Sequence, residues 1–125
     1  MNIPKDLRYV KTHEWASKEG KNVRIGITDH AQHEITDVVH VELPSKGKKV
    51  EKGQPCAVVE SVKSAFDIYA PVSGTVIEVN DKLDSNPELV NQSPYKDGFF
   101  VVIEASNMPE YDSLMSPEDY EKSLK

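Results

Sequence analysis

Short segments in which apolar and polar residues alternate recur along the chain, separated by segments rich in glycine, proline and charge. The alternating segments are VKTHEWAS, KNVRIGIT, TDVVHVELP, PCAVVESV, SAFDIYAP and TVIEVN, and FFVVIEA adds a continuous apolar run. A period of two is typical of β-strands, because successive side chains point to opposite faces. Val23, Ile25 and Ile27 would share one face of their strand. Val39, Val41 and Leu43 would share one face of theirs. Many short strands with close turns predict a mainly β sandwich or barrel.

Three segments carry the signals of short helices. TDHAQHEI can be capped by Thr28 or Asp29, because their side-chain oxygens accept the first free N–H groups. NPELV predicts one helical turn with Asn86 as the cap, and SPEDYEKSLK predicts a helix capped by Ser116. In both of the latter, proline follows the cap at the first helical position. We therefore expect residues 107–125 to form a helical C-terminal segment, and we expect SKGKKVEKGQ to be a charged loop.

The bulk composition limits what the chain can bind. Its 125 residues suggest a single domain, residues 1–125. The net charge of -6 argues against nucleic-acid or anionic-membrane partners, which need an excess of Lys and Arg to offset phosphate. The N-terminal stretch MNIPKDLRYVKTHEW has neither the apolar run of a signal peptide nor the Arg- and Ser-rich character of a transit peptide. We expect a cytoplasmic protein, or a mitochondrial-matrix protein if the chain is a processed eukaryotic one.

Lys63 occupies an unusual position between two predicted strands, in VVESVKSAFDIYAPVSG. Its neighbours Val62 and Ser64 are not the Gly, Asn or Asp that tight turns prefer, so turn chemistry does not explain the bend. Most lysines are simply solvated surface charges. A lysine held out on a rigid turn, however, is what a modifying enzyme would need in order to recognise it as the base of a longer arm.

Other reactive residue types have plainer interpretations. Cys56, the one cysteine, lies inside a predicted strand and is expected to be an inert core thiol. His30 and His33 could share a helical face, but a zinc site usually needs three or four protein ligands, so we expect no metal. The sequence has no G-x-S-x-G, P-loop or G-x-G-x-x-G motif. We therefore expect no catalytic residues.

The segment ESVKSAFDIYAPVSG strongly resembles the lipoylation site of the H protein of the glycine cleavage system. Further segments match that family in its order, namely YVKTHEW, IGITDHAQ, DVVHVELP, VEKGQPCAVVESVK, GTVIEVN, NPELVNQSPY and DG. The resemblance implies a barrel-sandwich hybrid of two antiparallel sheets, as in lipoyl and biotinyl carriers, with short helices and a C-terminal helix. It implies that Lys63 carries lipoate in amide linkage.

The same resemblance implies a non-catalytic carrier with defined partners. The P protein (glycine dehydrogenase, decarboxylating) would load an aminomethyl group, the T protein (aminomethyltransferase) would unload it, and the L protein (dihydrolipoyl dehydrogenase) would reoxidise the dithiol. A lipoylating enzyme is a fourth partner, and we expect a monomer. The loaded aminomethyl group is an ammonium that would be lost in water as ammonia and formaldehyde. It therefore needs a sheltering site, and a cation removed from water needs a hydrogen-bond acceptor or a carboxylate. Glu14, Asp67 and Thr12 are the candidates; otherwise the two acids would belong to a solvated sheet face.

Other functions stay open at this point. The same lysine would serve a relay protein that supplies lipoate or octanoate to other lipoyl domains. A biotin carrier is disfavoured because biotin sites flank the lysine with Met, and an unmodified interaction module is the plainest alternative. The sequence departs from the family pattern at three places. Ile35-Thr36 occupies the place where Leu-Gly is expected, Phe99-Phe100 follows DG where Trp is usual, and Ser64 replaces the commoner Ala. Thr does not easily adopt the positive φ open to Gly, so the turn at Thr36 is expected to differ.

Overall fold

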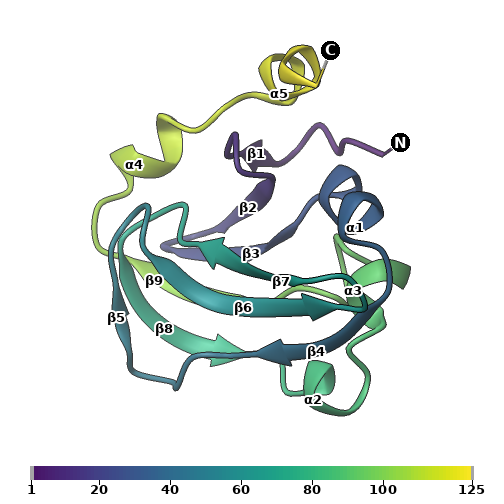
Figure 1. The fold of residues 1–125 in the computed structure, drawn as a ribbon. Coiled ribbons are helices and arrows are strands. Elements are labelled where there is room, and N and C mark those ends of the chain that lie inside the picture. Colours follow the sequence, from purple (N-terminus) through teal and green to yellow (C-terminus); the bar gives the residue numbers. More distant parts are fainter. Residues whose placement is uncertain (1, 125) are drawn as a thin grey trace.

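The computed structural model describes residues 2–124. Nine strands and five short helices occur in this part of the chain (Figure 1). In chain order they are β1 (Arg8–Tyr9), β2 (Glu14–Glu19), β3 (Asn22–Ile27), α1 (Asp29–Ile35), β4 (Val38–Glu42), β5 (Lys49–Val50), β6 (Pro55–Ser61), β7 (Ala65–Tyr69), β8 (Gly74–Val79), α2 (Lys82–Ser85), α3 (Leu89–Gln92), β9 (Val101–Ala105), α4 (Pro109–Asp112) and α5 (Pro117–Ser123).

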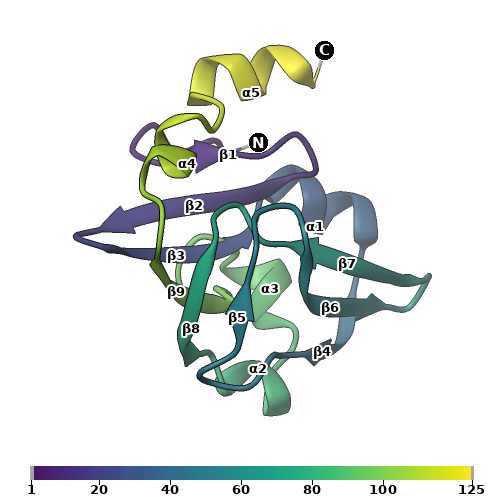
Figure 2. The same ribbon diagram turned by 90° about the vertical axis from the view of Figure 1, so that its left-hand side faces the viewer.

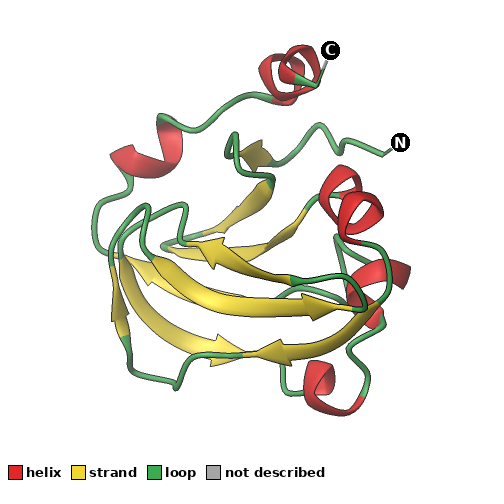
Figure 3. Cartoon of the chain, viewed as in Figure 1, coloured by secondary structure: helices red, strands yellow, loops and turns green. Residues whose placement is uncertain are grey.

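The strands form two antiparallel sheets that do not close into a barrel. The larger sheet has the order β1-β2-β3-β9-β8-β5, and the smaller one has the order β4-β6-β7. Figure 3 shows the two layers of strands with the helices placed around their ends. The expected mainly β fold with two antiparallel sheets, short helices and a C-terminal helix is confirmed.

The main core lies between the two sheets. The predicted inward face of β3 is buried as expected, with Val23, Ile25 and Ile27 at 3% exposure or less. Phe100 joins the same core, and Phe99 belongs to a second cluster. Alternation in the sequence therefore identified the buried face of β3 correctly, because one face of this strand packs against the smaller sheet.

The second cluster attaches the C-terminal segment to the larger sheet. It consists of Leu7, Tyr9, Trp15, Phe99, Val102 and Tyr120. Tyr9 also exchanges backbone hydrogen bonds with Met115, both 2.9 Å long, and its ring stacks on Tyr120 at 4.7 Å between centroids. Figure 2 shows α5 lying beyond β1, on the side away from the smaller sheet. Helix α5 is thus held through an aromatic contact and a two-residue bridge.

Two strand predictions need correction. The segment VKTHEWAS was predicted as one strand, but a turn separates β1 from β2, closed by hydrogen bonds between Val10 and both His13 and Glu14. In β4, a register shift between Val38 and His40 breaks the alternation. Val38 and Val41 are buried while Val39 is 53% exposed, so Val39 does not share the buried face. A bulge adds one residue to a strand and reverses the face of those beyond it.

Of the three predicted helices, the two with a hydroxyl side chain at the cap are confirmed. Thr28 caps α1 by accepting from Ala31 N, and Ser116 caps α5 by accepting from Asp119 N. The NPELV prediction was misplaced: α3 begins at Leu89, and Asn86 ends the unpredicted helix α2. The expected charged loop contains the short strand β5. Within residues 2–124, no helix has the length and apolar character needed to cross a membrane.

The turn after α1 keeps a left-handed conformation although Thr replaces the expected Gly. Thr36 has φ 64° and ψ -148°, so threonine here adopts the positive φ that is easier for glycine. Asn91 stabilises this turn, because its side-chain amide donates to Thr36 O at 2.7 Å and its Oδ1 accepts from Val38 N at 2.9 Å. Tertiary hydrogen bonds therefore impose a backbone conformation that threonine disfavours.

Candidate functional site

Lys63 lies at the tip of the β6–β7 hairpin, which projects from the body of the molecule in Figure 2. The hydroxyl of Ser61 accepts from Lys63 N at 3.1 Å and from Ser64 N at 3.3 Å, and Ser61 N donates to Ser64 O at 2.8 Å. The inference that turn chemistry does not explain the bend is therefore wrong. That inference was drawn from Val62 and Ser64 alone and left out Ser61, whose hydroxyl can close such turns.

The side chain of Lys63 is accessible from solvent. It is exposed, and its Nζ donates only to Glu34 O at 3.4 Å, a long hydrogen bond. Lys63 forms no ion pair with any of the residues 2–124. The tip itself is anchored, because Val62 N donates to Asp37 O at 3.0 Å across to the residue before β4. An exposed amine thus extends from an anchored backbone.

A groove of about 580 Å³ runs beside β7 and opens between that strand, α1 and the turn before β2. The apolar part of its lining is formed by Ile27, Ala31, Ile35, Val59, Phe66 and Ile68. Its polar and charged part is formed by Lys11, Thr12, His13, Glu14, His30, Glu34, Asp67 and Tyr69. All three proposed acceptor residues, Thr12, Glu14 and Asp67, lie in this one groove although 55 positions separate the first from the last.

Glu14 is buried at the floor of the groove, with 1% of its surface exposed. One carboxylate oxygen accepts from Tyr69 N at 2.9 Å, and the other accepts from the hydroxyl of Thr12. Burial raises the pKa of Glu14 to about 7, against these two hydrogen bonds, which lower it. The alternative interpretation of Glu14 as a solvated sheet residue is therefore wrong, whereas Asp67 and Thr12 are exposed at the groove rim.

His13 and His30 form a part of the groove wall that the sequence did not indicate. Their rings lie 4.6 Å apart, and His30 Nε2 lies 3.7 Å from Glu34 Oε1. His13 has a φ of 76°, and its Nδ1 is hydrogen-bonded to the hydroxyl of Tyr120 at 2.8 Å. Burial and the neighbouring His30 lower the pKa of His13. No local sequence signal links these residues, because Tyr120 is 107 positions from His13.

Cys56 and the remaining histidines, His33 and His40, do not line this groove. Cys56 is buried, and burial raises the pKa of its thiol to about 12, which fits an inert core thiol. His33 is exposed on α1. Among residues 2–124, no cluster of three or more His, Cys, Asp or Glu side chains is arranged to hold a metal ion.

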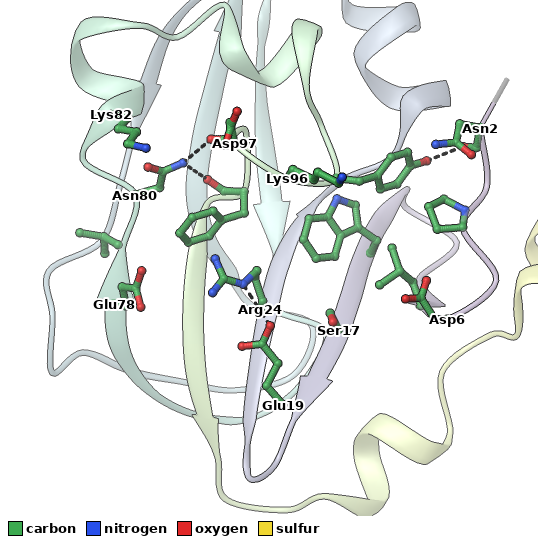
Figure 4. Close-up of a pocket in the computed structure, with 16 residues that line it drawn as sticks. Asn2, Asp6, Ser17, Glu19, Arg24, Glu78, Asn80, Lys82, Lys96 and Asp97 are labelled. Carbon is green, nitrogen blue, oxygen red and sulfur yellow. Dashed lines mark hydrogen bonds and ion pairs between the residues drawn. The ribbon is translucent and has the colours of Figure 1, made fainter.

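A second hollow, of about 630 Å³, lies over the larger sheet (Figure 4). Its polar groups bond mainly to one another. Asn80 Nδ2 donates to Asp97 O at 2.7 Å and to Phe99 O at 2.8 Å, and Arg24 Nε lies 3.3 Å from Glu19 Oε2. With these partners already in place, the hollow has a structural explanation.

An exposed lysine on an anchored hairpin, beside a groove with a buried carboxyl group, is an arrangement that fits the class of carrier proteins. The fold agrees with this class. A glycine cleavage system H protein from Mycobacterium marinum superposes with a TM-score of 0.90 at 32% identity, covering 98% of both chains.

Sequence comparison identifies the family of this carrier. The model of the family described as Glycine cleavage H-protein matches residues 7–125, and the chain belongs to this family. The glycine cleavage system H protein of Endomicrobium trichonymphae is 57% identical over 99% of this chain and 100% of its own. That of Thermus thermophilus is 54% identical over 100% of this chain and 98% of its own. The protein is thus a carrier subunit of the glycine cleavage system, and H proteins as a family carry lipoate.

Proposed function

We propose that Lys63 carries lipoate in amide linkage and that the protein shuttles the aminomethyl group of glycine between the P, T and L proteins. The observation that carries this proposal is the position of Lys63, an exposed amine on an anchored hairpin next to the groove. The long hydrogen bond to Glu34 O is easily given up, so the amine is available to a lipoylating enzyme.

The residues of the groove have a separate role in this proposal. When attached, lipoate supplies the disulfide whose sulfur accepts the aminomethyl cargo. The cargo bears a positive charge, and a cation removed from water needs an acceptor or an opposite charge. Glu14 supplies a buried carboxyl group, Asp67 an exposed carboxylate at the rim, and Thr12 a hydroxyl that orients Glu14. The apolar walls exclude water from the sheltered cargo.

Loss of a groove carboxylate is expected to shorten the life of the loaded state. Glu14→Gln and Asp67→Asn remove the charge with little change in shape. Because a charge-assisted hydrogen bond contributes about 1.5–3 kcal/mol, each variant should release ammonia and formaldehyde about tenfold faster or more. The decay of isolated aminomethyl-loaded protein measures this rate. Asp84→Asn, an exposed acid on α2, is the control and should decay as wild type does. Equal decay in all four proteins would rule out this sheltering site.

Two measurements test the carrier function itself. Intact mass after treatment with a lipoylating enzyme should show one lipoyl increment, and peptide mapping should place it on Lys63. Lipoylated protein should then support exchange of labelled bicarbonate into glycine with the P protein. Lipoylation without exchange would instead favour a relay protein that supplies lipoate or octanoate to other domains. Absence of any increment would overturn both.

We also propose that residues 1–125 form one carrier domain, with 107–125 as its helical C-terminal segment. The packing of α5 on β1 through Tyr9 and Met115 supports this view. A monomer and a cytoplasmic location stay predictions, which size-exclusion chromatography with light scattering and cell fractionation would test.

A further inference from the structure

The hydroxyl of Tyr120 joins three segments that are distant in the sequence. It lies 2.8 Å from His13 Nδ1 and 2.7 Å from Thr28 Oγ1, and the Tyr120 side chain is fully buried. Burial raises the pKa of Tyr120, so the hydroxyl stays protonated as a donor. A buried hydroxyl with two partners of this kind is costly to remove, because its partners lose hydrogen bonds that water reaches poorly.

The two partners of Tyr120 belong to two segments that form adjoining walls of the groove, the turn before β2 and helix α1. His13 is in the turn before β2, directly between the groove residues Thr12 and Glu14. Thr28 caps α1, and α1 supplies His30 and Glu34 to the other wall. One backbone hydrogen bond, from Thr28 N to His13 O at 3.0 Å, also joins the walls at this point. The hydroxyl of Tyr120 therefore ties together two segments that line the groove.

His13 has an unusual backbone conformation, so its hydrogen bond to Tyr120 helps to maintain that conformation as well as to pack the side chains. His13 adopts φ 76°, a left-handed conformation that non-glycine residues rarely take and that the surroundings must maintain. Its carboxyl-side neighbour is Glu14, so a relaxation of His13 would rotate Glu14 relative to α1. Helix α5 is meanwhile held by contacts that do not involve the groove, through Tyr9 and Met115.

We propose that Tyr120 is a positioning residue through which the C-terminal helix holds the two walls of the groove at the spacing that retains the loaded arm. Tyr120 contacts neither Lys63 nor the cargo and acts through His13 and Thr28. The inference rests on the proposed function in one respect only, namely that the groove shelters the cargo.

The test compares two variants that each lose one buried tyrosine hydroxyl from the same stacked pair of rings. Tyr120→Phe removes the two hydrogen bonds to the groove walls. Tyr9→Phe is the matched control, because its hydroxyl donates to Pro4 O at 2.5 Å, away from the groove. We expect Tyr120→Phe to speed release of the aminomethyl cargo by about threefold to tenfold, the range for one or two lost hydrogen bonds. Tyr9→Phe should release it at the wild-type rate, and both variants should be lipoylated normally.

A second measurement needs no arm and separates positioning from general loss of stability. In unmodified protein, amide hydrogen exchange should accelerate at residues 12–14 and 28–34 in Tyr120→Phe and should stay unchanged there in Tyr9→Phe. Equal acceleration in both variants, or none in Tyr120→Phe, would overturn the inference. If exchange responds as expected but cargo release does not, the groove is set by Tyr120 but is not the shelter, and the inference about arm retention is wrong. Failure of the wild type to accept lipoate would instead overturn the proposed function, and the exchange measurement would still decide whether Tyr120 positions the walls.

Discussion

Lys63 and Glu14 differ in what their surroundings require of them. Lys63 is exposed and makes one long hydrogen bond, so its side chain can change without disturbing the fold. Glu14 is enclosed and both of its oxygens accept hydrogen bonds, so its side chain is part of the packing. Substitutions at the two positions should therefore separate modification from stability.

Lys63→Arg should abolish lipoylation while leaving the fold intact. Arginine keeps the charge, but its guanidinium cannot form the lipoyl amide. Because the position is an exposed hairpin tip, the free energy of unfolding should change by no more than about 0.5 kcal/mol. Mass spectrometry after enzymatic lipoylation and a urea denaturation curve measure the two effects. Normal incorporation of lipoate into the arginine variant would contradict the assignment of Lys63.

Thr36→Gly should stabilise the protein. A non-glycine residue in this left-handed region costs about 1–3 kcal/mol, whereas the greater flexibility of glycine in the unfolded chain costs about 0.5–1 kcal/mol. The net gain in the free energy of unfolding should be about 1 kcal/mol, read from urea denaturation. Thr36→Ala keeps the strain and is the control. Equal stability of the glycine and alanine variants would show that the turn is not strained.

We expect the lipoylating enzyme to recognise the geometry of the β6–β7 hairpin as well as its lysine. Ser61 closes the tip, and Val62 N ties it to Asp37 O. The direction of the Lys63 side chain is therefore set by the hairpin. A change that preserves composition but moves the lysine tests whether the lipoylating enzyme depends on this direction.

Exchanging the two tip residues, in the double variant Lys63→Ser with Ser64→Lys, should sharply reduce lipoylation. The shifted lysine would leave the backbone in another direction, since neighbouring side chains of an extended chain alternate in direction. Composition and net charge stay the same, so any loss comes from geometry. The initial rate of lipoate incorporation is the measurement. If the shifted lysine is labelled as fast as Lys63, exposure alone is sufficient for the lipoylating enzyme.

On the scale of the whole molecule, the buried carboxyl group of Glu14 couples stability to pH. Its pKa rises from 4.5 to about 7 on folding. Below pH 4.5 the group is neutral in both states and costs nothing. Between pH 4.5 and 7 the unfolded chain loses its proton first, so stability falls as pH rises, and above pH 7 the loss is complete. The loss is on the order of 3 kcal/mol.

Glu14→Gln should remove this dependence on pH. Glutamine can accept from Tyr69 N and donate to Thr12, and it carries no charge. The variant should match wild type near pH 4.5 and be more stable by about 3 kcal/mol near pH 8, according to urea denaturation at each pH. All other ionisable groups are shared by the two proteins, so their contributions cancel in the difference. A difference in stability that does not vary with pH would show that folding does not raise the pKa of Glu14.

Sequence alone was enough for the elements that depend on neighbouring residues and for the resemblance that pointed to the family. The inward face of β3, the caps at Thr28 and Ser116 and the candidate lysine followed from alternation, hydroxyl capping and the motif around Lys63. Such features depend on a few residues close together in the chain, so they can be recognised without the fold.

Tertiary structure decided the rest, because burial and hydrogen-bond partners depend on residues far apart in the chain. It buried Glu14 against Tyr69, joined His13 to Tyr120 and forced Thr36 into a conformation that its own side chain disfavours. It also exposed Val39 through a bulge that alternation does not reveal. The groove exists only where three distant segments meet. For that reason no local pattern predicted its apolar lining or the places of His13 and His30, although Thr12, Glu14 and Asp67 were expected near the loaded arm.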